Sequence, residues 1–275
     1  MAVDNTTKKR PNTLLEVNGQ DLTIRLIRNA TVVIKIDGKT LLVDPMFSPK
    51  SALDPIPWTN EIRNPTVGLT LSNEEIKEVI QQSDAVVLTH LHPDHWDEAA
   101  RTLIPKSKAI ICQAEDVPTL IENGFSHLTY SGDTKLENGI RIIRVEAQHG
   151  HGELADKMGP ASGYIIQGQE KTIYIAGDTV WYEGVEKTIE RYNPDVIIVN
   201  AGGARFQFGE PITMTTADVL QVVKASKQGA KIIVVHMEAV NHCYLTRSEL
   251  HLALEEEGIG ERCLIPADGE EIVLV

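Results

Sequence analysis

The chain has 275 residues, 42% of them hydrophobic and 24% charged, as expected for a folded globular protein and not for a disordered one. Its 39 Asp and Glu exceed its 26 Lys and Arg by 13, and its longest basic run is the three residues Lys8, Lys9 and Arg10. This charge balance argues against a nucleic-acid partner. The sequence also lacks the ~20-residue apolar stretch of a membrane span, an apolar secretion signal and any Cys-x-x-Cys pair, so we expect a cytoplasmic protein without a transmembrane segment or a disulfide framework.

Short apolar runs rich in Val and Ile alternate with amphipathic stretches along most of the chain. Residues 1–12 are polar and expected to form a frayed tail, and 13–275 are expected to form a single domain, because no Pro/Gly/Ser-rich linker interrupts them. The apolar runs predict strands at Leu22–Ile27, Thr31–Ile36, Thr40–Val43, Ala85–Leu88, Ala109–Cys112, Ile140–Val145, Gly163–Ile166, Thr172–Ile175, Val196–Val199 and Ile232–Val235. The amphipathic stretches predict helices at Asn73–Gln81, Asp94–Leu103, Ala114–Glu122, Glu183–Arg191, Thr215–Lys224 and Arg247–Glu256. This alternation indicates an α/β fold with sheets at the centre and helices outside.

Residues 46–70 form an insertion that interrupts this alternation. The segment holds Pro49, Pro55, Pro57, Pro65 and Trp58 and has no hydrophobic periodicity. A loop of this length inside a compact domain is usually a lid or a binding loop, although a simple surface excursion fits the same pattern. In the first case, Trp58 would cover a pocket.

A weak internal repeat relates the two halves of the chain. Residues 30–44 contain an apolar strand, a turn at Gly38, a second apolar strand and then Asp44. Residues 161–178 show the same order, with a turn at Gly168 and a final Asp178. Two such hairpins, each opening one half, suggest a duplicated sandwich.

The segment that follows the expected strand Ala85–Leu88 carries the strongest chemical signal. Three histidines and one aspartate lie there at H-x-H-x-D-H spacing: His90, His92, Asp94 and His95. Residues two apart in an extended backbone point to the same face, so the first two histidines are expected to lie together. Pro93 favours the first turn of a helix, which would turn the other two side chains back toward them. Imidazole and carboxylate ligands without cysteine suit Zn²⁺ or a related divalent ion at an open site.

Further candidate ligands follow the ends of other expected strands. His149 and His151 follow the strand at Ile140–Val145, while Asp178 and His236 each follow another. In a layered α/β protein these ends lie along one edge, where ligand sites generally form. Either His149 or His151 could reach a metal, because the two are on one side of an extended segment.

These motifs, in this order, resemble those of the metallo-β-lactamase-fold hydrolases over most of 20–275. The resemblance implies a four-layer αββα sandwich with a dinuclear metal site on its edge. It also implies a ligand set for each of two ions: His90, His92 and His149 on one, and Asp94, His95 and His236 on the other, with Asp178 bridging both. Asp44 matches an early acidic position of the family that supports the ligands from behind. Within the superfamily, the Asp-Pro-Met turn, the insertion and the His-Gly segment look most like the branch of ascorbate-phosphate lactonase and the N-acyl-phosphatidylethanolamine phospholipase D relatives.

Two divalent ions, with Zn²⁺ favoured and Mn²⁺ an alternative, would lower the pKa of a shared water and polarise a carbonyl or phosphoryl oxygen. We therefore expect a hydrolase in which a metal-bound hydroxide attacks a small ester, lactone or phosphodiester. The alternative is a non-catalytic member that keeps the fold to bind a metal or a metabolite. A homo-oligomer is compatible with the sequence.

Other side chains are candidates for supporting roles. Asp94 is expected to orient the nucleophile, and His242 to serve either as the general acid or as a packing residue. Arg205 and Arg247 could hold an anionic substrate, although most arginines are solvated or structural. If His151 is not a ligand, it would either contact substrate or be merely solvated.

Overall fold

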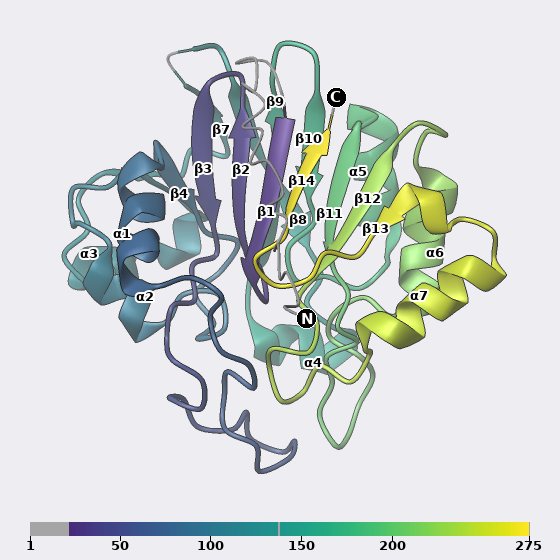
Figure 1. Cartoon of the computed structure of the whole chain (residues 1–275). Helices are drawn as coiled ribbons and strands as arrows, with labels where there is room; N and C mark the ends of the chain where they lie inside the picture. The colour runs from purple at the N-terminus through teal and green to yellow at the C-terminus, as the bar shows by residue number, and fades with distance from the viewer. Residues whose placement is uncertain (1–21, 137, 275) are drawn as a thin grey trace, which may run out of the picture.

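Two facing β-sheets form the centre of the protein, and helices cover the outer face of each sheet (Figure 1). The computed structural model describes residues 22–136 and 138–274, and the tail expected at 1–12 lies outside them. The layers run helix, sheet, sheet, helix, so the four-layer αββα sandwich expected from the sequence is confirmed.

The first sheet has seven strands. From edge to edge they are β14 (Glu271–Leu274), β1 (Leu22–Arg28), β2 (Thr31–Ile36), β3 (Lys39–Val43), β4 (Ala85–Val87), β5 (Ile110–Ile111) and β6 (Leu128–Thr129). The strands from β14 to β3 pair antiparallel, whereas those from β3 to β6 pair parallel. The carboxyl ends of β3 and β4 therefore meet at the same edge of the sheet.

The second sheet repeats this arrangement. Its strands are β13 (Cys263–Leu264), β12 (Lys231–Val235), β11 (Val196–Asn200), β10 (Thr172–Ile175), β9 (Ala161–Gln167), β8 (Arg141–Ala147) and β7 (Asp133–Lys135). Here β7 to β10 pair antiparallel and β10 to β13 pair parallel. The order β2-β3-β4 of the first half thus corresponds to β9-β10-β11 of the second, as the repeat of Asp44 and Asp178 predicts.

Four of the six predicted helices agree with the structure to within one residue at each end. They are α1 (Asn73–Gln82), α2 (Glu98–Leu103), α3 (Val117–Glu122), α4 (Gly152–Met158), α5 (Glu183–Tyr192), α6 (Thr216–Ala225) and α7 (Arg247–Glu256), with short 3₁₀ turns η1 (Ala114–Asp116) and η2 (Gly260–Arg262). The single helix expected at Ala114–Glu122 is wrong, because η1 and α3 meet at Asp116, just before Pro118 in the first turn of α3. Helix α4 and the short strands β6, β7, β13 and β14 were not predicted.

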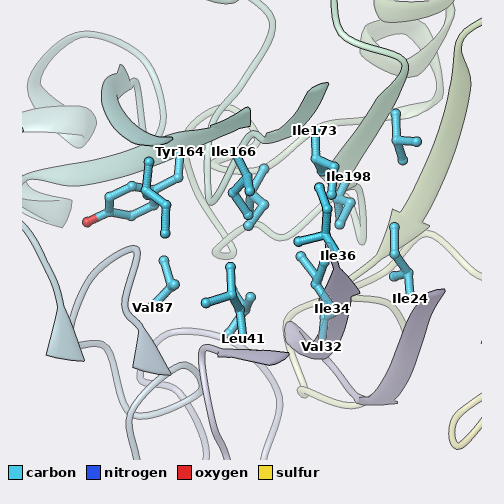
Figure 2. Packing of buried hydrophobic residues seen from close by; sticks show 14 of the residues in the cluster. Ile24, Val32, Ile34, Ile36, Leu41, Val87, Tyr164, Ile166, Ile173 and Ile198 are labelled. Carbon is cyan, nitrogen blue, oxygen red and sulfur yellow. The ribbon is translucent and has the colours of Figure 1, made fainter. Parts of the chain in front are cut away.

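The strands carry apolar side chains on both faces, which is why four layers form. In β2, Val32, Ile34 and Ile36 point into the core between the sheets, whereas Val33 packs under the helices of the first half. Figure 2 shows such side chains of both sheets meeting in the inter-sheet core, with Leu41 on one side and Ile166 on the other. Full burial of one such side chain contributes about 1.5–3 kcal/mol to folding. The two sheets are thereby held as one rigid support for the loops at their edge.

The insertion at 46–70 leaves β3 and lies at the lower end of the molecule in Figure 1. The buried guanidinium of Arg28 fixes both of its ends, since it donates to the carbonyls of Met46 and Ser48 at 2.9 Å each and to that of Val67 at 3.2 Å. Between these ends the segment has no helix and only one isolated antiparallel bridge, from Leu53 to Asn64. The prediction of a loop is correct.

In the described part of the chain, no helix is long and apolar enough to cross a membrane. The three cysteines, Cys112, Cys243 and Cys263, are all free.

Candidate metal centre

The strand ends bring the predicted metal ligands together at one edge of the sandwich. His90 and His92 follow β4, His149 follows β8, Asp178 follows β10 and His236 follows β12. The loops that follow these strands gather at the same end as the insertion and α4 (Figure 1). Residues separated by as many as 146 positions therefore share one site.

The side chains form two compact groups of potential ligand atoms. The first group is His90, His92 and His149, and the second is Asp94, His95, Asp178 and His236. Within each group the potential ligand atoms all lie within 4.8 Å of one another. Asp178 also links the groups, since its Oδ2 atom lies 3.4 Å from His149 Nε2 and 3.2 Å from His95 Nε2. This division matches the two sets that the family resemblance implies, including the position of Asp178 between them.

The chemistry of these atoms fits divalent cations. His90 Nε2 faces His92 Nδ1 at 2.9 Å, and His95 Nε2 faces His236 Nε2 at 3.2 Å. A single proton can satisfy only one nitrogen of each pair as a donor, whereas a cation interacts favourably with the lone pairs of both. Nitrogen and carboxylate ligands without thiolate are those that Zn²⁺ and related divalent ions accept at open sites. Both groups can therefore hold a metal ion.

Three of the remaining ring nitrogens contact partners outside the groups. Asp44 Oδ2 lies 2.9 Å from His95 Nδ1, and the carbonyl of Ile212 lies 2.8 Å from His149 Nδ1. Thr89 Oγ1 lies 3.1 Å from His90 Nδ1. Such partners fix the ring orientation and the tautomer of metal-ligating histidines. Asp44 thus lies where the sequence predicted, behind the ligands.

The backbone is strained at the strand ends that carry the site. Asp44 and His236 adopt positive φ angles of 43° and 62°, which non-glycine residues rarely do. Gly177, directly before Asp178, has a φ of 68°, and a Cβ atom there would lie 2.4 Å from the carbonyl oxygen of Ser162. Glycine is therefore required for the turn that aims Asp178 into the site.

The pKa values of the side chains differ between the two groups of potential ligands. Burial would lower the pKa of His95, but Asp178, Asp94 and Asp44 outweigh it and raise that pKa to about 10. Burial lowers the pKa of His149 to about 4 and holds the pKa of His90 well below its usual value. Although burial opposes ionisation of Asp94 and Asp178, the neighbouring imidazoles hold both carboxyl pKa values well below their usual range. The ionised carboxylates of the second group thus attract positive charge, either a proton on His95 or a metal ion, while burial favours the neutral imidazoles of His90 and His149.

The local structure around Asp94 and His95 differs from the prediction. The expected helix at Asp94–Leu103 is wrong at its start, because α2 begins only at Glu98. The amides of His95 and Trp96 both donate to the carbonyl of His92 at 2.9 Å, so a tight turn precedes the helix. Asp97 caps the helix by accepting from the amide of Ala100. The turn, rather than a helical first turn, directs Asp94 and His95 toward the ligand groups.

His149 and His151 occupy different environments. His149 is buried in the first group, whereas His151 is exposed at the start of α4 and its Nδ1 lies 3.5 Å from Gln148 Nε2. His151 belongs to neither ligand group and does not line the cavity at the site. The geometry favours His149 as the ligand.

A cavity of about 560 Å³ opens onto this centre. At its inner end lie His92, Asp94, His149, Asp178 and His242. Its other walls are mostly apolar and come from the insertion, α4 and the loop after β11: Ile56, Pro57, Trp58, Leu154, Met158, Phe206 and Phe208, with Lys157 and Pro93 completing the lining. Trp58 therefore borders the cavity, in keeping with the prediction of a binding loop at 46–70.

His242 lines the cavity beside the candidate ligands. Its side chain is buried, and within the described chain its Nδ1 atom has no hydrogen-bond partner. Burial lowers its pKa to about 4, so the imidazole is neutral at pH 7. The ring stacks against Phe206 with centroids 6.4 Å apart. His242 can therefore meet a bound molecule as a neutral hydrogen-bonding group rather than as an imidazolium acid.

The two candidate arginines lie outside the cavity. Arg247 forms ion pairs with Glu238 at 2.6 Å and Asp268 at 2.7 Å, and its Nε donates to the carbonyl of Pro266. The expectation that it holds substrate is wrong, because its guanidinium is fully engaged at the start of α7. Arg205 is exposed, and its guanidinium lies 5.2 Å from the ring centroid of Tyr244.

Three supporting residues were missed at the sequence level. Asn200 donates to Asp178 Oδ1 at 2.6 Å, Thr89 donates to Asp44, and Asn29 donates to the backbone carbonyl of Asp94 at 3.0 Å. Asn200 ends β11, so the rule that found the other strand-end residues applies to it as well. The apolar wall residues Leu154, Met158, Phe206 and Phe208 carried no comparable signal.

The fold and the paired ligand groups define a member of the β-lactamase superfamily, and a family model described as the Beta-lactamase superfamily domain matches residues 39–237. The chain belongs, within it, to the UPF0173 metal-dependent hydrolases. It is 38% identical over 255 residues to the UPF0173 protein YddR of Bacillus subtilis (strain 168), covering 90% of this chain and 98% of that protein. A UPF0173 metal-dependent hydrolase of Geobacillus sp. (strain WCH70) is 26% identical over 89% of this chain and 97% of its own length. The finer branch expected from the Asp-Pro-Met turn stays a prediction.

Two solved structures are similar along nearly their whole length. An isothiocyanate hydrolase from Delia radicum gut bacteria is 38% identical, with a TM-score of 0.86, and the match covers 92% of this chain and 99% of that one. A possible metal-dependent hydrolase from Veillonella parvula DSM 2008 is 35% identical, with the same TM-score of 0.86, over 93% and 99% of the two chains. Yeast PDE1, at 14% identity and a TM-score of 0.61, shares the fold.

Proposed function

We propose that the protein uses two divalent metal ions to hydrolyse a small, uncharged molecule that has both an electrophilic carbon and an apolar substituent, with an isothiocyanate as the leading substrate class. The observation that carries this proposal is the mostly apolar cavity of about 560 Å³ that ends at Asp94, Asp178 and the histidines. The likeness to an isothiocyanate hydrolase at 38% identity over 92% of this chain supports the same class.

The lining of the cavity favours some substrates expected from the sequence over others. An ester or a lactone with an apolar substituent is uncharged and suits these walls. A phosphodiester carries a permanent negative charge, and proteins usually bind it with arginine or lysine in addition to any bound metal ions. Among the described residues that line the cavity, Lys157 is the single cationic side chain. We therefore rank the ester and the lactone second and the phosphodiester last.

The residues at the inner end have distinct proposed roles. His90, His92 and His149 would hold one ion, Asp94, His95 and His236 the other, and Asp178 would bridge them. Such ions, when bound, would lower the pKa of a water and polarise the electron-rich end of the substrate. Asp94 would orient the attacking water by accepting a hydrogen bond from it. His242 would donate a hydrogen bond to the substrate atom on which negative charge develops.

Hydrolysis of an isothiocyanate needs only water as co-reactant. The water oxygen bonds to the central carbon, the π electron pair of the C=N bond moves to nitrogen, and one water proton ends on that nitrogen. The resulting thiocarbamic acid then breaks its C–N bond, and the electron pair of that bond goes to nitrogen. The nitrogen takes the second water proton, and the O–H electron pair left behind forms the second bond between carbon and oxygen. The products are an amine and carbonyl sulfide. The apolar walls of the cavity would contact the apolar substituent during both steps.

The test is a substrate panel with protein loaded with Zn²⁺ or Mn²⁺. Benzyl and allyl isothiocyanate, 4-nitrophenyl acetate, a γ-lactone and bis(4-nitrophenyl) phosphate would be compared by amine release, acid release or chromophore release. We expect the highest kcat/KM for an isothiocyanate and loss of that activity after metal removal. Turnover confined to the ester or lactone would replace the leading substrate class, and unchanged turnover in rigorously metal-free protein would overturn the mechanism.

A further inference from the structure

We infer that Trp58, together with Phe206 and Phe208, forms an aromatic wall that selects substrates carrying an aromatic ring. This inference rests on the proposed function, because it assigns the substituent of the substrate bound at that site. Trp58 comes from the insertion and the two phenylalanines come from the loop after β11, and all three line the cavity.

Four rings form a continuous series from the inner end of the cavity to its mouth. The centroid of His242 lies 6.4 Å from that of Phe206, and Phe206 lies 5.9 Å from Phe208 in a stacked arrangement. Phe208 in turn meets Trp58 edge to face, with centroids 6.0 Å apart. Planar rings at these spacings present flat faces and edges that interact favourably with another aromatic ring. A substrate whose reactive carbon lies near His242 would place its substituent along this series.

Trp58 is exposed and yet conformationally constrained. Its side chain is 68% exposed, the largest exposure among the large apolar residues of the described chain. Its backbone has a φ of 57°, a left-handed conformation that costs a bulky residue free energy and is kept mainly at functional positions. Burial in the core cannot account for this conformation, because the ring is not buried.

Hydrogen bonds hold the backbone of Trp58 against the opposite loop. The amide of Gln207, which lies between the two phenylalanines, donates to the carbonyl of Trp58 at 2.8 Å, and the Gln207 side chain donates to the carbonyl of Thr59. Asn241, next to His242, donates to Thr59 Oγ1 at 2.6 Å. The insertion is thus tied both to the phenylalanine loop and to the segment that carries His242. The wall is preorganised, which lowers the entropic cost of binding a rigid ring.

The first test compares substrates with and without a ring. In Trp58→Ala we expect kcat/KM for benzyl isothiocyanate to fall roughly tenfold and that for methyl isothiocyanate to fall much less, so that the ratio of the two decreases. Trp58→Phe should restore most of the ratio. The matched control is Ile62→Ala, which removes another exposed apolar side chain of the insertion, 56% exposed, that does not line the cavity. A ratio unchanged in Trp58→Ala would overturn the inference.

A binding experiment separates this inference from the proposed reaction. Metal-loaded protein would be titrated with benzamide, an unreactive aromatic probe, and with propionamide, while tryptophan fluorescence is followed. In the native protein we expect a saturable fluorescence change with benzamide and little change with propionamide. In Trp58→Ala, where binding is measured by calorimetry, we expect much weaker binding of benzamide. Binding of benzamide without hydrolysis of any isothiocyanate would reject the proposed reaction and keep the aromatic wall. Equal binding of both amides would reject the wall.

Discussion

Asp44 and His95 are buried side chains joined by a 2.9 Å contact between Asp44 Oδ2 and His95 Nδ1. The same carboxylate accepts hydrogen bonds from the backbone amide of Thr89 at 2.8 Å and from its hydroxyl at 2.7 Å. Asp44 therefore connects the end of β3 to the segment that carries the first three candidate histidines. The opposite nitrogen of His95 is left to face Asp178 and His236.

Asp44→Asn should weaken metal binding without removing a ligand. The amide keeps the size of the carboxylate but carries no charge to stabilise the orientation and basicity of His95. Loss of such a partner typically costs 10–100-fold in metal affinity or activity. Competition with a chromophoric chelator would measure the affinity, and exposed Glu190→Gln is the control for loss of one negative charge. Native affinity in Asp44→Asn would contradict the role assigned to this contact.

His92→Ala and His151→Ala should behave differently. The first removes a member of the buried histidine group, so we expect loss of bound metal, measured by atomic emission, together with loss of turnover. The second removes an exposed side chain outside both groups and should keep the metal content. If His151→Ala loses metal while His149→Ala keeps it, the assignment of these two histidines must be exchanged.

His242→Ala should lower kcat more than it raises KM. Removal of one positioned proton donor typically costs about 10²-fold or more in rate. Metal content should be unchanged, because His242 belongs to neither ligand group. Its pKa of about 4 implies that the neutral imidazole is fully present above roughly pH 5, so its contribution to kcat should be constant from pH 6 to 8. A contribution that disappears as the pH rises through 7 would indicate an imidazolium acid instead.

Asp116→Asn should increase the free energy of unfolding, relative to the native protein, more at neutral pH than at acidic pH. Burial raises the pKa of Asp116 to about 6, above its ordinary value of 3.8, and its Oδ2 atom has no hydrogen-bond partner among the described residues. The folded state therefore binds this proton more tightly than the unfolded chain, and the stability that this gives is lost as the pH rises from about 4 to 6. The free energy of unfolding of the variant minus that of the native protein, from urea titrations, should increase between pH 4 and pH 8. A difference that is constant with pH would contradict the raised pKa.

Arg247→Ala should destabilise the fold and leave substrate binding intact. The change leaves Glu238 and Asp268 without their partner in a part-buried network, and we expect a loss of about 1–3 kcal/mol in the free energy of unfolding. Arg205→Ala is the matched control, because that guanidinium is exposed and its removal should change stability by less than about 0.5 kcal/mol. An increase in KM in Arg247→Ala without loss of stability would restore the role in substrate binding.

Site residues could be predicted from the sequence where a potential metal ligand directly follows an apolar strand. Asp178 and His236 could be predicted because each follows an apolar run whose burial and direction are set by its pattern, and parallel neighbours must end at the same edge. Asn200 obeys the same rule but was missed, since an amide after a strand is common and does not indicate a metal.

Features that depend on tertiary contacts could not be predicted in this way. Pro93 was compatible with an immediate helix, but the hydrogen bonds of the turn and the cap at Asp97 delay the helix until Glu98. The cavity wall combines Leu154 of α4 with Phe206 and Trp58 from two irregular loops. These segments have no hydrophobic period, and α4 buries none of its residues, so nothing in the order of residues indicated that they meet.

The hydrogen bonds from Arg28 to both ends of the insertion have a consequence for how this segment can evolve. Because Met46, Ser48 and Val67 are tied to one guanidinium, the distance that the intervening segment must span is set by the scaffold and not by the segment itself. Lengthening a loop between fixed anchors is thermodynamically inexpensive, since each doubling adds only about 0.6 kcal/mol of closure entropy. The stretch at 49–66 can therefore change in length and sequence while the sheets stay as they are, provided that a new segment replaces the contacts of Thr59 with Gln207 and Asn241.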